Sequence, residues 1–163
     1  MHPEQNKIII DTLNVMRYLE LEVAHFYEIC SQTCGSEEKL FWRSLVKSEK
    51  KHAAYIEKMI GIISQRPNDF VRGVPFNTVA VNTVLASLKN NIERLQQGGI
   101  DKNRVLFVAR DYENAMMESR YGEVVKTKDV EYLMLMDEIV RNTTEHRNML
   151  NRKISEANQN KSK

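Results

Sequence analysis

The three prolines of this chain all lie outside its long apolar-periodic segments, and this placement constrains the fold more than any other feature. Pro3 precedes the first such segment, and Pro67 and Pro75 lie between the second and the third. Because proline breaks the interior of a helix, the remaining segments are free to be helical. The chain has only six glycines, so turns are few and we expect long elements.

Apolar residues recur at intervals of three and four in five segments, which is typical of helices with one buried face. The expected helices span about residues 5–34, 36–64, 78–95, 103–126 and 130–158, followed by a frayed polar tail, 159–163. Asp129 can cap the last helix. The inward stripe of that helix is expected to be Leu133, Met136, Val140, Thr143, His146, Leu150 and Ile154.

The connections between these helices predict the topology. Only Gly35 separates the first two helices in the regions expected, so they should be antiparallel neighbours. A long crossover carrying a short extra helix then leads to the last two. Two antiparallel hairpins joined by one long crossover are the ferritin-like arrangement among four-helix bundles. We therefore expect an all-α, ferritin-like four-helix bundle, with residues 1–158 as a single domain.

Ionisable residues interrupt the apolar stripes near the middle of all four main helices. They are Glu20, Glu49, His52, Glu113 and His146. An isolated buried carboxylate is costly unless it is paired, protonated or bound to a metal, so interruptions on four helices predict a shared site. Glu49 and His52 form an E-x-x-H motif. Residues three apart share a helix face, so this carboxylate and imidazole can reach the same ion.

The last helix departs from the pattern of a complete dinuclear site. A di-iron or di-manganese carboxylate site in a bundle takes one Glu from each of two helices and an E-x-x-H motif from each of the other two. Here Thr143 stands three residues before His146. Glu145 points about 100° away and Glu138 lies about 12 Å along the axis, so neither replaces the missing carboxylate. The sequence predicts three carboxylates and two histidines.

Four segments together resemble the rubrerythrin-like branch of the ferritin-like superfamily, over nearly the whole chain. They are LELEVAHFYEIC around Glu20 and Tyr27, SEKKHAAYIEKM around Glu49 and His52, ARDYENAMMESRY around Glu113, and TTEHRNML around His146. The resemblance implies a carboxylate-bridged di-iron centre that reduces peroxide or oxidises ferrous iron with oxygen. The implied catalytic residues are Glu20, Glu49, Glu113 and Tyr27, with Tyr27 hydrogen-bonding a ligand carboxylate. The implied metal ligands are Glu20, Glu49, His52, Glu113 and His146.

Three functions are open at this level. The first is a di-iron oxidoreductase that needs an external electron donor, because the chain has no rubredoxin domain with Cys-x-x-Cys pairs. Thr143 favours the second, a storage-related protein that holds a single iron, manganese or zinc ion through Glu20, Glu49 and His52 without turnover. The third is a metal-free interaction module whose inward acids are protonated or paired with Arg120.

Several other residues have two interpretations. Tyr121 is either a hydrogen-bond partner of a ligand carboxylate or a core aromatic with a polar tip. Cys30 and Cys34 share a helix face, where a disulfide is geometrically awkward. They are either buried apolar side chains or a redox or soft-metal pair. His25 faces away from Glu20 and is expected at the surface, and the terminal His2 carries no argument.

Composition excludes other classes of function. The 24 Lys and Arg residues and 22 Asp and Glu residues leave a net charge of +2, which argues against binding nucleic acid or a membrane surface through bulk charge. Two cysteines exclude a disulfide scaffold and a Cys-rich metal module. No apolar stretch has the length of a membrane span and no secretory leader is visible, so we expect a cytoplasmic protein. A homodimer is also expected, since elongated bundles often pair.

Overall fold

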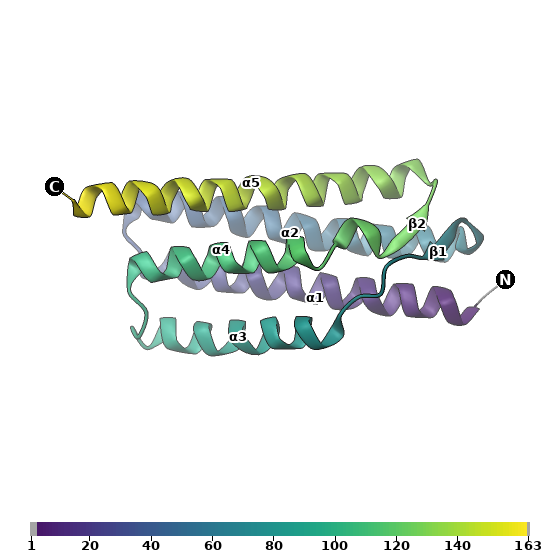
Figure 1. Cartoon of the computed structure of the whole chain (residues 1–163), viewed down its shortest axis with the longest axis horizontal. Coiled ribbons are helices and arrows are strands. Elements are labelled where there is room, and N and C mark those ends of the chain that lie inside the picture. Colours follow the sequence, from purple (N-terminus) through teal and green to yellow (C-terminus); the bar gives the residue numbers. More distant parts are fainter. Residues whose placement is uncertain (1–2, 163) are drawn as a thin grey trace.

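The computed structural model describes residues 3–162. Over this range it contains five α-helices, two 3-10 helices and one two-stranded antiparallel sheet (Figure 1). In chain order the elements are α1 (Pro3–Thr33), α2 (Ser36–Gln65), η1 (Pro67–Asp69), β1 (Phe70–Arg72), α3 (Thr78–Gln96), α4 (Lys102–Glu118), η2 (Tyr121–Glu123), β2 (Val125–Thr127) and α5 (Val130–Lys161). The prediction of an all-helical bundle is confirmed. The last helix continues to Lys161, into the segment expected to be a tail.

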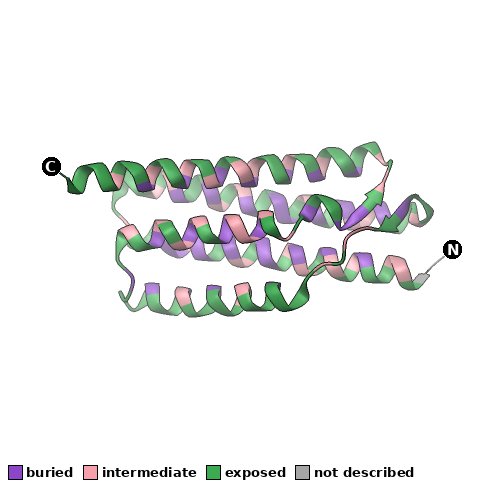
Figure 2. Ribbon diagram, in the orientation of Figure 1, coloured by how far each residue is buried: buried purple, intermediate pink, exposed green. Residues whose placement is uncertain are grey.

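The long helices lie side by side as two antiparallel pairs. The first pair is α1 with α2 and the second is α4 with α5, while α3 runs along α1 in the crossover between the pairs (Figure 1). The two short strands lie near the end of the bundle where α1 begins (Figure 1). In each long helix the buried residues face the neighbouring helices and the exposed residues face outward (Figure 2). The buried faces of the long helices therefore form the interior of the bundle.

Aspartate caps fix the starts of the second pair of helices. The Asp101 carboxylate accepts hydrogen bonds from the backbone N–H groups of Asn103 at 2.8 Å and Arg104 at 3.1 Å. Asp129 accepts one from the backbone N–H of Tyr132 at 2.9 Å, which confirms the predicted cap. Such a side chain satisfies backbone donors that the first helical turn leaves free, and is typically worth about 1 kcal/mol.

The fourth predicted helix extends eight residues too far. It ends at Glu118 rather than near residue 126, because Arg120 adopts the left-handed conformation at φ 56° and the chain then forms η2 and β2. Strand β2 pairs with β1 in a register that places Phe70 opposite Thr127. Apolar residues continue at helical spacing through this segment, so local periodicity alone does not indicate where the helix ends.

The inward face of α5 also differs from the prediction. Leu133 and Val140 are 42% and 40% exposed, whereas Tyr132 and Ile139 are buried. At these two places the predicted stripe is one residue away from the buried position, because it averaged about 3.5 residues per turn and the helix has about 3.6. The positions from Met136 onward that both stripes share are buried, including the two that matter for the site, Thr143 and His146.

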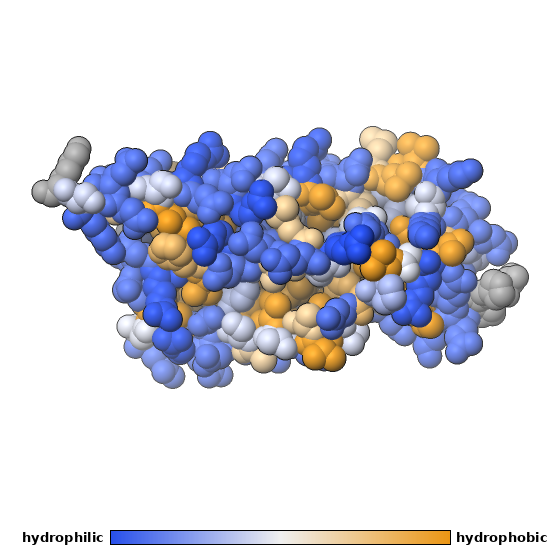
Figure 3. All heavy atoms as spheres, viewed as in Figure 1, coloured by the Kyte–Doolittle hydropathy of each residue, from blue (hydrophilic) through white to orange (hydrophobic). Residues whose placement is uncertain are grey.

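The surface carries few large apolar groups. The face in Figure 3 is mainly hydrophilic, with small groups of hydrophobic side chains, one of them over the start of α5. In that first part of α5, Val130 and Met134 are exposed. Among residues 3–162, none of the helices has both the length and the apolar character needed to cross a membrane.

Candidate metal centre

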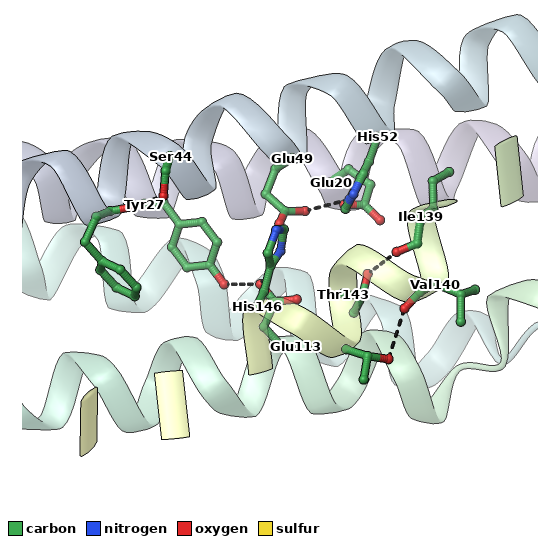
Figure 4. A network of polar contacts seen from close by, with 12 residues as sticks. Glu20, Tyr27, Ser44, Glu49, His52, Glu113, Ile139, Val140, Thr143 and His146 are labelled. Carbon is green, nitrogen blue, oxygen red and sulfur yellow. Dashed lines mark hydrogen bonds and ion pairs between the residues drawn. The ribbon is translucent and has the colours of Figure 1, made fainter. Parts of the chain in front are cut away.

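The fold brings together all five ionisable residues that the sequence predicted to face inward. Glu20 comes from α1, Glu49 and His52 from α2, Glu113 from α4 and His146 from α5, and Figure 4 shows their side chains converging. The exposed fraction of His146 is 5% and that of the other four is zero. Four separate helices therefore place three carboxylates and two imidazoles in one dry region of the bundle.

The first three of these residues form one ligand group. The Nδ1 atom of His52 lies 3.3 Å from an oxygen of Glu20 and 3.3 Å from Oε2 of Glu49. One ligand atom from each residue lies within 4.8 Å of the other two. All three can therefore contact a single ion placed between them.

Glu49 belongs to a second group as well, with Glu113 and His146. Nδ1 of His146 lies 2.7 Å from Oε1 of Glu49 and 3.5 Å from Oε1 of Glu113. The two oxygens of Glu49 therefore face different histidines. This geometry defines two neighbouring positions for an ion, with one carboxylate between them.

Many of the ligand atoms have no hydrogen-bond partner within the protein. The buried ligand atoms with neither a hydrogen bond nor an ion pair are Oε1 of Glu20, Nε2 of His52 and Oε2 of Glu113. Buried polar atoms without partners are rare and costly. A bound cation would satisfy the free carboxylate oxygens of Glu20 and Glu113, so the residues present fit a metal ion.

In the absence of a metal, this cluster retains protons. Burial, together with the negative charge of Glu49, raises the pKa of Glu113 to about 7 and also raises the pKa of Glu20. Burial disfavours the charged form of His52, but hydrogen bonds to Glu20 and Glu49 outweigh it and raise its pKa to about 10. Hydrogen bonds to Glu113 and Glu49 raise the pKa of His146 to about 10 in the same way.

Tyr27 contacts the cluster from α1. Its hydroxyl donates a 2.5 Å hydrogen bond to Oε1 of Glu113 (Figure 4), and the residue is fully buried. A hydrogen bond of this kind fixes the orientation of a carboxylate that can bind a metal. The resemblance implied that Tyr27 donates a hydrogen bond to a ligand carboxylate, and Tyr27 donates one to Glu113, a candidate ligand.

Thr143 lies beside the cluster but contributes no ligand to it. Its hydroxyl donates a 2.9 Å hydrogen bond to the carbonyl of Ile139 in its own helix (Figure 4), and the residue is buried. Glu138, the nearest acid upstream in α5, instead pairs with Lys51 at 2.6 Å. Arg120 pairs with Glu123 and belongs to none of the ion pairs of the inward acids.

The remaining candidates fall outside the cluster or on its border. His25 is exposed, as expected, and His2 lies outside the described residues. Cys30 is buried and its pKa is raised by burial, which disfavours the reactive thiolate. Tyr121 is buried near the cluster, and its hydroxyl has no partner. The sequence left open whether Tyr121 is a hydrogen-bond partner of a ligand carboxylate or a core aromatic, and the unpartnered hydroxyl does not decide between the two.

Comparisons of the chain with family models, with curated proteins and with solved structures found no match. The assignment of the site therefore rests on its own geometry.

Proposed function

We propose that this protein is a ferritin-like, rubrerythrin-like oxidoreductase with a dinuclear metal centre, acting on peroxide or on ferrous iron and oxygen. The observation that carries the proposal is the position of Glu49 between two histidines in two buried ligand groups. A protein that held one ion would need only one such group. Two groups with a shared carboxylate support two ions side by side.

The donor set favours iron. Carboxylate and imidazole ligands suit iron, manganese and zinc, whereas sites for soft metals use thiolates, and neither Cys30 nor Cys34 belongs to either ligand group. Zinc has no redox chemistry, whereas bound ferrous iron would give electrons to peroxide and to oxygen, so iron is the metal proposed. Reduction of one hydrogen peroxide to two waters takes two electrons and two protons, and a bound pair of ferrous ions would supply those two electrons.

The residues of the chain hold and shield the centre. Glu20 and His52 would bind one ion and Glu113 and His146 the other, with Glu49 between them. The Tyr27 hydroxyl orients Glu113 through its hydrogen bond. Because all of these side chains are buried, bulk water is kept from the reacting groups, and electrostatic interactions inside the site are stronger than at the surface.

The proposal includes an external electron donor and a reducing compartment. The two cysteines are free thiols and too few for a rubredoxin-type iron site, so the electrons would come from outside this bundle. Free thiols are typical of the cytoplasm, where we place this protein.

The test is peroxide consumption by anaerobically iron-loaded protein. We expect the ferrous protein to consume about one peroxide per two irons, faster than the same concentration of free ferrous iron. Glu49→Gln should abolish this advantage because it removes the shared carboxylate. Glu138→Gln, a change of the same chemistry on the same bundle but outside the ligand groups, should retain it. Consumption no faster than that of free iron would rule out the peroxidase function.

Thr143 is the specific observation that favours a second candidate. Without a fourth carboxylate the second position has fewer protein ligands than a complete site. In that case the protein holds one ion through Glu20, Glu49 and His52 and has no turnover. One metal per chain together with no peroxide consumption would select this candidate.

A further inference from the structure

A small cavity lies beside the candidate metal centre, where the last helix lacks its carboxylate. Its volume is about 210 Å³, and it is a partly open pocket between the end of α4, η2 and α5. Thr143 and Tyr121 both line it. Thr143 stands three residues before His146, as Glu49 stands three residues before His52, so the cavity adjoins the position equivalent to that of a metal-binding carboxylate.

Tyr121 provides an unused hydrogen-bond donor at this cavity. The residue is 4% exposed, and its hydroxyl has no hydrogen-bond partner in the protein. Burial, together with the negative charges of Glu20, Glu49 and Glu113, raises the pKa of Tyr121 well above its usual value. A buried hydroxyl without a partner is costly, so the cavity has a polar group suited to an acceptor that the protein itself does not supply.

The charge of the loaded site favours an anion. The three carboxylates would carry three negative charges against the four positive charges of two divalent ions. With neutral histidines one positive charge remains, and an excess charge in a buried site is costly unless it is paired. Each ligand group also contains only three residues, fewer than the four to six ligands usual for these metals. One monoanion with two oxygens would supply both the missing charge and the missing ligands.

The side chains that line the cavity indicate the polarity of the rest of the anion. Met116, Met117 and Val140 contribute apolar side chains to the lining. A short alkyl group is compatible with these walls. Arg120 and Glu123 line the cavity as well, but their charges are paired with each other.

We propose that the cavity binds a small monocarboxylate of the size of formate or acetate. Its carboxylate takes the place of the one missing at Thr143 and accepts a hydrogen bond from Tyr121. The alkyl group lies against the apolar walls. This inference rests on the dinuclear centre proposed above and extends it, since the centre would be completed by a ligand from solution rather than by the chain.

Acetate titration of the cobalt-loaded protein tests the inference, with the visible spectrum of Co²⁺ as the readout. We expect a saturable spectral change in the wild type. Thr143→Glu should abolish it, because the new carboxylate occupies the cavity. Tyr121→Phe should raise the acetate Kd about tenfold, which is typical of the loss of one hydrogen bond to a charged group. Tyr132→Phe is the matched control. The Tyr132 hydroxyl is also buried without a partner, but burial alone perturbs it, so acetate binding should not change.

The outcomes separate the two proposals. If cobalt does not bind, both the metal centre and the carboxylate site are overturned. If two cobalt ions bind and acetate leaves the spectrum unchanged, only the carboxylate site is overturned. An acetate Kd that is the same in wild type and Thr143→Glu also overturns it. Should Thr143→Glu fail to fold, equal acetate Kd values for Tyr121→Phe and Tyr132→Phe would contradict the inference.

Discussion

The imidazole rings of His52 and His146 lie nearly parallel, at an interplanar angle of 21° and with 5.6 Å between ring centroids. They come from α2 and α5, and Nδ1 of each faces a different oxygen of Glu49. The shared carboxylate of Glu49 thus joins the two ligand groups. Because the pKa values of both histidines are raised, an ion that enters the site must displace their protons.

Metal affinity should increase with pH. The pKa values of His52 and His146 are raised to about 10, so both carry protons at neutral pH when no metal is present. Below the pKa of a ligand, the apparent metal Kd falls about tenfold for each unit by which the pH rises, for each proton that the ion displaces. We expect the Mn²⁺ Kd to fall at least tenfold from pH 6 to pH 7, and again to pH 8, in calorimetric titrations. A Kd independent of pH would show that the ion does not displace protons from these histidines.

The stability of the metal-free protein should decrease as the pH rises from about 6.5 to 10. The raised pKa of each histidine means that the folded state binds a proton more tightly than the unfolded state, so the stabilisation is complete below about 6.5 and lost near 10. The raised pKa of Glu113 adds a loss between about 4.5 and 7. Thermal melts of metal-free protein should show Tm falling over this range. A rising Tm would contradict the charge state assigned to the cluster.

Removal of the Tyr27 hydroxyl should destabilise the protein, whereas removal of the Tyr132 hydroxyl should not. Tyr27 donates a short buried hydrogen bond to Glu113, and its loss is expected to cost about 2 kcal/mol of unfolding free energy. The Tyr132 hydroxyl is buried without a partner, so Tyr132→Phe should be neutral or slightly stabilising. Urea unfolding of Tyr27→Phe and Tyr132→Phe gives the comparison. Equal unfolding free energies in the two variants would mean that the hydrogen bond to Glu113 contributes no stability.

Two glycines should respond to alanine in opposite directions. A Cβ at Gly73 would collide with the backbone carbonyl of Glu123, next to the segment that carries Tyr121. Gly73→Ala is therefore expected to cost about 2 kcal/mol or more of unfolding free energy. Gly61 lies inside α2 near its C-terminal end, and a Cβ there meets nothing within 4 Å, so Gly61→Ala should stabilise by about 0.5–1 kcal/mol. Denaturant midpoints measure both, and a harmless Gly73→Ala would contradict the close packing of this turn.

The sequence predicted the helices and the five clustered residues because both depend on local periodicity. Glu20 and Glu49 stood out as charged residues on stripes that were otherwise apolar. A carboxylate on such a stripe indicates a buried site wherever the apolar spacing identifies the inward face of the helix. The cluster itself followed from the expectation that the middles of bundled helices meet.

The segment after Glu118 could not be predicted in this way. Its pairing with β1 joins residues more than fifty positions apart, such as Phe70 and Thr127, and no local pattern signals that contact. No sequence pattern predicts the left-handed conformation of Arg120 either. The position of Tyr121 at the cavity depends on both, and therefore so does the proposed carboxylate site.

The most direct test of the account is the number of divalent ions bound per chain. Metal-free protein would be titrated with Mn²⁺ under anaerobic conditions, and the bound ions counted in wild type and in Glu20→Gln, Glu49→Gln and Glu138→Gln. The account predicts two ions for wild type and for the surface control Glu138→Gln, one for Glu20→Gln, and weakened binding at both positions for Glu49→Gln. A wild-type count of zero or one, or a count of two that survives Glu49→Gln with unchanged affinity, would contradict it.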